Sequence, residues 1–251
     1  METIIHIENL QKSFGEKKVL CGVNLEVKRG ESLVIIGRSG CGKSVLLKHI
    51  NGLIPPDSGR VEVLGEVWGE ITGKRMAEVR KRIGMLFQSA ALLDSLTVAE
   101  NVGLGLKESF GLSEKEITAI VNEKLDMVGM GGTNDLYPSS LSGGMRKRIG
   151  LARAIATNPD IVLYDEPTTG LDPITADMIN DLILELHSRL DITSISVTHD
   201  MRAAYKTAQR IVMLYDGIIE YEGTPEQIKN SGNAIVDQFI NGRAEGPIRI
   251  G

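Results

Sequence analysis

The chain has 251 residues and a formal net charge of −5 at pH 7, with 28 Lys and Arg against 33 Asp and Glu. This length fits one large α/β domain, or one domain with a subdomain, around a sizeable core. The acidic balance gives no electrostatic case for nucleic-acid binding. No apolar run approaches the ~18–20 residues of a membrane span, so we expect any membrane link to come through a partner.

The first third of the chain is expected to be rich in strands. Apolar residues alternate with polar ones over residues 5–7 and 23–27, which predicts half-buried antiparallel strands. Residues 32–36 are continuously apolar and precede a glycine, as in a buried parallel strand. A short helix is predicted over 43–50, followed by strands over 60–64 and 83–87.

The segment of about residues 89–157 is expected to be helical. Ser113 and Glu116 form a capping box ahead of apolar positions at helical spacing, and a glycine-rich patch at 129–132 ends that helix. A second helix is predicted from Ser142 through Arg153.

Alternation of strands and helices then resumes. We expect strands over 161–164 and 193–198, and a helix over 173–190 that Asp172 caps. Asp216-Gly217 predicts a hairpin. The pattern indicates one domain with an α/β core (about 1–88 and 158–243), a helical subdomain (about 89–157) and a C-terminal tail (244–251), expected to be loose or partner-dependent.

The clearest chemical motif is a phosphate-binding loop, GRSGCGKS, between the buried strand and the short helix. Backbone N–H groups of such a loop surround phosphate oxygens, and the helix N-terminus adds partial positive charge. The lysine reaches the β and γ phosphates, and the last serine can bind Mg²⁺. The predicted nucleotide-binding residues here are Gly37, Arg38, Ser39, Gly40, Cys41, Gly42, Lys43, Ser44 and Val45. A cysteine inside this loop indicates a free thiol and a reducing compartment.

Two adjacent carboxylates follow the buried strand over 161–164. Asp165 lies where a parallel strand meets a ligand crevice and can hold a hydrated Mg²⁺. Glu166 then suits a base that polarises the attacking water. The alternative is an exposed acidic turn before Pro167.

A second glycine pair lies in LSGGM, residues 141–145, and opens another predicted helix. Its amide groups also suit an anion. Because the chain has only one nucleotide loop, the economical interpretation is that Leu141, Ser142, Gly143 and Gly144 bind the γ-phosphate held by a second copy. The alternative is an ordinary serine-capped helix.

Three further side chains complete the candidate set. His199 follows the strand over 193–198 and can hydrogen-bond a γ-phosphate, although it can equally be a surface or core residue. Gln88 can contact the metal or the water, or merely end a strand. Phe14 can stack on adenine or belong to the core. The basic cluster at 74–82 is interpreted as a solvated helix face, because no aromatic residues are interleaved with it and acids surround it. The cluster at 146–148 is interpreted in the same way, except that it lies near the proposed γ-phosphate site.

Taken together, GRSGCGKS, Gln88, LSGGM, the strand IVLYDEP, GLDP and His199 have the order and spacing of an ABC-transporter ATPase subunit, which the whole chain resembles. The resemblance implies a P-loop NTPase core with an N-terminal antiparallel β subdomain and an inserted helical subdomain. It implies ATP and Mg²⁺ as cofactors, with Ser44, Gln88 and Asp165 toward the metal. It implies Glu166, His199, Gln88 and Lys43 in catalysis and Asp172 beside the nucleotide. It also implies a head-to-tail pair with two ATP molecules between the copies.

Shorter stretches, including residues 86–92 and 241–247, resemble the ATPases of bacterial Mla/MCE-type lipid transport systems. That likeness implies an MlaE-like permease, an MlaB-like STAS-domain protein, an MlaD-like MCE protein and a place on the cytoplasmic face of the inner membrane. Met145 departs from the glutamine common in the wider family and cannot donate a hydrogen bond.

Three functional hypotheses follow. The chain powers lipid transport, or it powers transport of another cargo such as an amino acid or a metal, or it is a non-transport ABC ATPase. The last class carries coiled coils or tandem ATPase halves, and this sequence has neither. Apolar residues Ala90, Ala91, Leu92, Leu93 and Leu96, just after Gln88, are expected to dock on the permease or to pack inside the helical insert.

Overall fold

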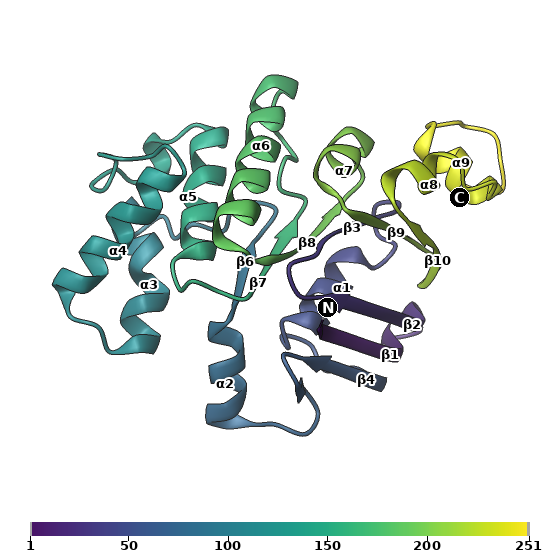
Figure 1. Ribbon diagram of the computed structural model, residues 1–251, viewed down its shortest axis with the longest axis horizontal. Helices are drawn as coiled ribbons and strands as arrows, with labels where there is room; N and C mark the ends of the chain where they lie inside the picture. The colour runs from purple at the N-terminus through teal and green to yellow at the C-terminus, as the bar shows by residue number, and fades with distance from the viewer. Residues whose placement is uncertain (1, 250–251) are drawn as a thin grey trace. The chain divides into compact units, whose positions relative to one another are not determined.

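The computed structural model describes residues 2–249, with residue 109 by its backbone alone. Figure 1 shows the chain coloured from its N-terminus to its C-terminus. The chain divides into two units. Unit 1 combines the residues up to 76 with those from 195 on, and unit 2 comprises residues 77–194. Helix α2 (Gly73–Lys81) and strand β8 (Thr193–Thr198) contain residues of both units.

Unit 1 begins with an antiparallel sheet. β1 (Thr3–Phe14) pairs with β2 (Lys17–Lys28) on one side and with β4 (Ser58–Val63) on the other, and β5 (Glu66–Val67) pairs with β4. The apolar residues of the predicted alternation are all buried: Ile5, Ile7, Val23, Leu25 and Val27. The predicted N-terminal antiparallel β subdomain is therefore confirmed.

A second set of strands in unit 1 carries the phosphate loop. The wholly buried β3 (Ser32–Ile36) runs parallel to β9 (Arg210–Tyr215), which forms a hairpin with β10 (Ile218–Gly223). The turn residues Asp216 and Gly217 have φ of 44° and 79°, as a two-residue hairpin turn with both central residues left-handed requires. Helix α1 (Lys43–Ile50) follows β3, as predicted.

Three short helices complete unit 1 beside this hairpin: α7 (Met201–Thr207), α8 (Pro225–Lys229) and α9 (Ala234–Ile240). Their apolar faces share one cluster with β3 and β9 that includes Val34, Met213, Ile228 and Val236.

The expectation of a loose tail is wrong for its described part, residues 244–249. The Gln238 side chain donates to the carbonyls of Arg243 (3.2 Å) and Ile248 (3.1 Å), and it accepts from the Ile248 N–H (2.6 Å). Ile248 is buried in the same apolar cluster. Gly246 permits this approach, since a Cβ there would lie 2.4 Å from the Gln238 side chain. Residues 250–251 lie outside the described part.

Unit 2 packs helices around a two-stranded parallel ladder. β6 (Ile83–Leu86) pairs with β7 (Ile161–Asp165), both fully buried. Its helices are α3 (Val98–Phe110), α4 (Glu114–Met127), α5 (Gly143–Ile155) and α6 (Pro173–Leu190), with a 3₁₀ turn η1 (Pro138–Ser140) before α5. The predicted capping box at Ser113 is confirmed. The exact division at residues 88 and 157 stays a prediction.

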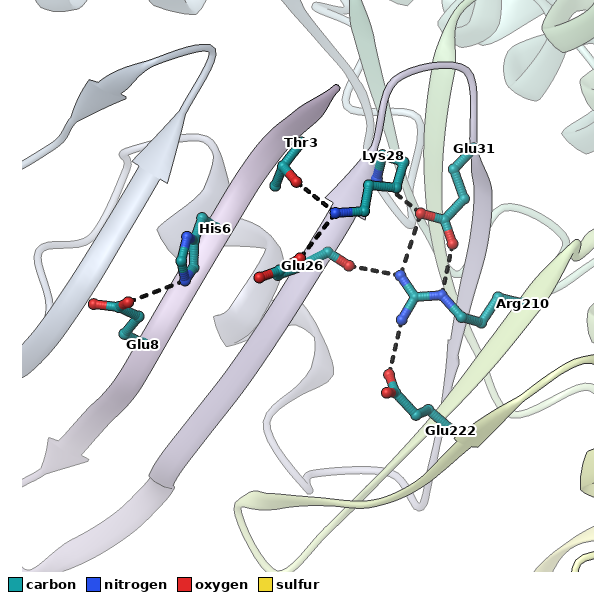
Figure 2. Close-up of polar contacts among 8 residues, drawn as sticks. All are labelled: Thr3, His6, Glu8, Glu26, Lys28, Glu31, Arg210 and Glu222. Carbon is teal, nitrogen blue, oxygen red and sulfur yellow. Dashed lines mark hydrogen bonds and ion pairs between the residues drawn. The ribbon is translucent and has the colours of Figure 1, made fainter. Parts of the chain in front are cut away.

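One arginine ties the two sets of strands in unit 1 together (Figure 2). Arg210, at the start of β9, donates to Glu31 (2.6 Å), to Glu222 on β10 (2.8 Å) and to the carbonyl of Glu26 on β2 (2.6 Å). Lys28 extends this network from β2 to Thr3 on β1 (2.6 Å). A surface hollow of ≈ 530 Å³ lies here. Because Arg210 and Lys28 already pair with Glu26, Glu31 and Glu222 of its lining, and His6 with Glu8, we assign it a structural role.

Candidate functional site

The phosphate loop lies in unit 1, between β3 and α1. Gly37, Gly40 and Gly42 all have positive φ, so the chain turns repeatedly as it enters the helix. A Cβ on Gly37 would lie 2.4 Å from the carbonyl oxygen of Leu214 on β9. Gly42 caps α1 without a side-chain hydrogen bond. The loop thus leads directly into the N-terminus of a helix, whose partial positive charge suits an anion.

The functional side chains of this loop are already positioned. Lys43 is buried, and its ammonium donates to the carbonyls of Gly37 (2.8 Å) and Arg38 (3.0 Å). Arg38 in turn donates to the carbonyl of Arg249 in the tail (3.0 Å). Burial raises the pKa of the Cys41 thiol, partly offset by the nearby Lys43. This thiol therefore remains protonated at neutral pH and does not act as a nucleophile.

Unit 1 also holds Phe14 and His199. Phe14 ends β1 and is 49% exposed, so it is not a core residue, and its ring lies 5.6 Å from the Lys12 ammonium. An exposed ring at this position is free to stack on a base. His199 is also exposed, directly after β8, and Asp200 beside it caps α7 by accepting from the N–H of Arg202 (2.8 Å).

The two carboxylates lie in unit 2 at the end of β7, both nearly buried. This burial excludes the alternative of an exposed acidic turn. Glu166 has a φ of 48°, a left-handed conformation that costs energy for a residue with a Cβ. The Thr169 hydroxyl donates to its carboxylate (3.1 Å) and the Thr169 N–H to its carbonyl (3.2 Å). β7 ends at Asp165, and the left-handed Glu166 begins the turn that follows it.

The LSGGM segment begins α5, with Ser142 as its N-cap accepting from the N–H of Met145 (3.2 Å). The glycine pair also has a packing role. A Cβ on Gly144 would lie 2.7 Å from the side chain of Thr175 in the first turn of α6. Asp172 caps that helix by accepting from the N–H groups of Ile174 and Thr175, each at 3.0 Å. Residues 141–144 and Asp172 are therefore brought together inside unit 2.

Helix α5 also holds the segment that follows β6. The Gln88 side chain is exposed, whereas its carbonyl accepts from the ammonium of Lys147 at 2.5 Å. The same ammonium lies 3.3 Å from the carbonyl of Glu166. Arg153, two turns further along α5, donates to the carbonyls of Ala90 (2.5 Å) and Ala91 (2.7 Å).

These contacts correct two sequence interpretations. Lys147 is not part of a solvated face: it is 4% exposed, and its pKa is lowered by burial against the opposing pull of Glu166 and Asp165. The sequence does contain a signal for this burial, because Lys147 lies four and seven residues before the buried Leu151 and Ala154, on the same face of the helix. Ala90 is 1% exposed and packs near Gly150, so it is not a docking contact.

Two other apolar residues of this stretch differ from each other in their burial. Leu92 packs against the core of unit 2, whereas Leu93 is exposed. Within the described part of the chain, no helix is both long and apolar enough to cross a lipid bilayer.

The family model described as "ABC transporter" matches residues 20–169, and the chain belongs to this family. It is an ATPase whose hydrolysis of ATP is coupled to transport.

Among its relatives is the intermembrane phospholipid transport system ATP-binding protein MlaF of Haemophilus influenzae. The two are 40% identical over 99% of this chain and 94% of that protein. The chloroplastic protein TRIGALACTOSYLDIACYLGLYCEROL 3 of Arabidopsis thaliana is also 40% identical, over 99% of this chain and 76% of that protein. The probable ribonucleotide transport ATP-binding protein mkl of Mycobacterium leprae is 39% identical, over 99% of this chain and 72% of that protein.

Solved structures agree on the fold. The dimeric ATP-binding cassette MJ0796, in a post-hydrolysis state bound to ADP and Pi, superposes with a TM-score of 0.81 at 34% identity, over 88% of this chain and 99% of that one. The expected P-loop ABC ATPase fold is therefore confirmed.

Proposed function

We propose that this protein is the ATP-hydrolysing subunit of a transporter that moves phospholipid between the inner and outer membranes through a separate permease. The observation that carries the cargo assignment is the similarity to MlaF over nearly the full length of both chains. Similarity to the Arabidopsis protein, which is named after a lipid, supports the same class.

The residues of the site fit a magnesium nucleotide. The phosphate loop has no room for a Cβ at Gly37 and leads into a helix N-terminus, whose partial positive charge suits a polyphosphate. Ser44, Gln88 and Asp165 supply the hydroxyl, amide and carboxylate oxygens that Mg²⁺ prefers. When bound, the ion neutralises charge on the phosphate oxygens.

In this assignment the chain's own groups divide the work of hydrolysis. Lys43 exchanges its contacts with loop carbonyls for the phosphates, and Phe14 stacks on the adenine. Glu166 accepts a proton from the attacking water, and His199 holds that water and the γ-phosphate in line. The products are ADP and phosphate.

The active form is a pair of copies in which residues 141–144 of each copy face the nucleotide of the other. The dimeric cassette structure supports the pairing of two copies. The permease would be MlaE-like, with MlaB-like and MlaD-like proteins in the same complex. Docking on the permease places this subunit at the cytoplasmic face of the membrane, and the exposed Leu93 is the docking contact we favour.

The lipid assignment is tested by deleting the gene and restoring it in variant forms. We expect the deletion to raise phospholipid on the cell surface and to increase sensitivity to detergent. The wild-type gene should reverse both effects, and Lys43→Ala, which lacks the phosphate-binding ammonium, should reverse neither although the protein accumulates.

A second candidate is transport of another cargo, since the relative mkl is named for ribonucleotides. Unchanged surface lipid in the deletion strain, with lost uptake of a small solute, would decide for this candidate.

A further inference from the structure

Lys147 is a buried cation whose role the nucleotide site does not explain. It lies on α5, and its ammonium is 2.5 Å from the carbonyl of Gln88 and 3.3 Å from that of Glu166. The two acceptors occupy equivalent positions on neighbouring strands. Leu86 of β6 is paired with Tyr164 of β7, and residues 88 and 166 each lie two residues after these.

The chain on both sides of Lys147 is held in unfavourable conformations. Glu166 has a φ of 48°, and the consecutive alanines 90 and 91 have φ of 60° and 46°. Such backbone persists only where its surroundings hold it. Here α5 supplies the holding groups, with Lys147 at residues 88 and 166 and Arg153 at residues 90 and 91.

Simple packing does not require an ammonium at this place. Removing a charge from water carries a large penalty, and an apolar side chain of similar length would fill the space without it. The ammonium adds hydrogen bonds that reach two separate segments at once. Its donors go to main-chain carbonyls, so they fix the path of the backbone.

We propose that Lys147 is a positioning residue that couples the segment after β6 to the catalytic base. The inference rests on the proposed function, in which Glu166 is that base. The exposed side chain of Gln88 responds to the nucleotide or the permease, and its inward carbonyl passes the displacement through Lys147 to the peptide of Glu166. Displacements of about 1 Å at a reacting group change rates by orders of magnitude, so this link sets turnover.

The decisive variant is Lys147→Met, which keeps the length of the side chain and removes its donors. Lys124→Met is the matched control. Lys124 is 2% exposed in the same unit, and its ammonium bonds to Asn158 (2.8 Å) and Glu123 (2.9 Å), away from the site residues.

In the purified complex with its permease, we expect Lys147→Met to lower kcat for ATP at least 10-fold while KM changes less than 2-fold. The control should keep kcat within 2-fold. Hydrogen exchange of the nucleotide-free protein supplies a readout independent of turnover. In Lys147→Met, the amides of residues 87–92 and those of residues 165–169 should all exchange faster than in the wild type. In the control, neither segment should exchange faster.

Wild-type kcat in Lys147→Met, or equal losses in both variants, would overturn the inference. So would faster exchange in only one of the two segments. If Lys147→Met does not fold, Lys147→Gln, which keeps a neutral amide group with two N–H donors, should show the same split with a smaller loss of kcat. Glu166→Gln separates this inference from the proposed function: wild-type turnover there removes the base assignment itself, whereas an inactive Glu166→Gln beside an active Lys147→Met removes only the coupling.

Discussion

Tyr164, next to the two carboxylates, is fully buried, and its hydroxyl has no hydrogen-bond partner within residues 2–249. Burial also raises its pKa, so the hydroxyl stays protonated and needs an acceptor. An unsatisfied buried polar group costs about 1–3 kcal/mol. We therefore expect Tyr164→Phe to increase the free energy of unfolding by about 1 kcal/mol, measured by thermal or urea denaturation.

The matched control for this prediction is Tyr221→Phe. The Tyr221 hydroxyl has an acceptor, the carbonyl of Gln227 at 3.5 Å, so its loss should leave stability unchanged or slightly lower. A destabilised Tyr164→Phe protein would mean that the hydroxyl is satisfied in solution.

Individual residues were predictable where a motif fixes both their type and their neighbourhood. The phosphate loop fits its predicted place because a buried strand must precede it and a helix must follow it. Lys147 was misassigned because three consecutive basic residues favour the prediction of a solvated helix face. The helical spacing of the neighbouring apolar residues nevertheless places the middle one toward the core. The main-chain acceptors that satisfy Lys147 are 59 and 19 residues away in the sequence, and no local pattern reveals them.

At the scale of elements, Arg210 holds together strands that are distant in sequence (Figure 2). It joins β9 to β10 and to β2, and its main partner Glu31 is largely buried. Charged hydrogen bonds of this kind contribute about 1.5–3 kcal/mol each. We expect Arg210→Met to lower the free energy of unfolding by about 2–3 kcal/mol, measured by urea denaturation.

The comparison for Arg210 is Arg60→Met, because Arg60 pairs with Glu62 and Glu70 at the surface. Exposed pairs contribute about 0–1 kcal/mol, so the change should be small. Similar losses in the two variants would show that the Arg210 network adds nothing beyond an ordinary surface pair.

Elements with strong end signals were predicted to within a residue. Helices 43–50 and 173–190 match the structure because Gly42 and the capping Asp172 fix their starts. Strand 193–198 also matches its predicted bounds. The start of α3 was not identified, although Thr97 and Glu100 form a capping box there. The docked tail could not be predicted, because its order depends on a side chain of α9 and an apolar cluster formed by distant strands.

At the scale of the whole molecule, the proposed pair makes each nucleotide site from two copies. Ser142 is exposed, so Ser142→Arg should fold normally and block hydrolysis at the partner's nucleotide while leaving binding by its own phosphate loop intact. Lys43→Ala should be inactive through its own loop. When the two variants are mixed, half of the pairs contain one native composite site, and about a quarter of the wild-type activity should return.

The measurement is ATP turnover against the mixing ratio, with each variant alone as its baseline. No recovery at any ratio, together with weaker nucleotide binding by Ser142→Arg alone, would indicate that residues 141–144 serve the nucleotide of their own chain.

The hydrogen bond from Arg38 to Arg249 also matters for handling the protein in the laboratory. A protein fused to the C-terminus is joined two residues after Arg249, whose carbonyl lies 3.0 Å from the Arg38 guanidinium of the loop expected to hold the phosphates. An affinity tag or fluorescent protein placed there would pull on that loop through Arg249 and its bond to Arg38, and a measured nucleotide affinity would then partly describe the fusion. Purification handles and labels therefore belong ahead of β1, where Glu2 is exposed.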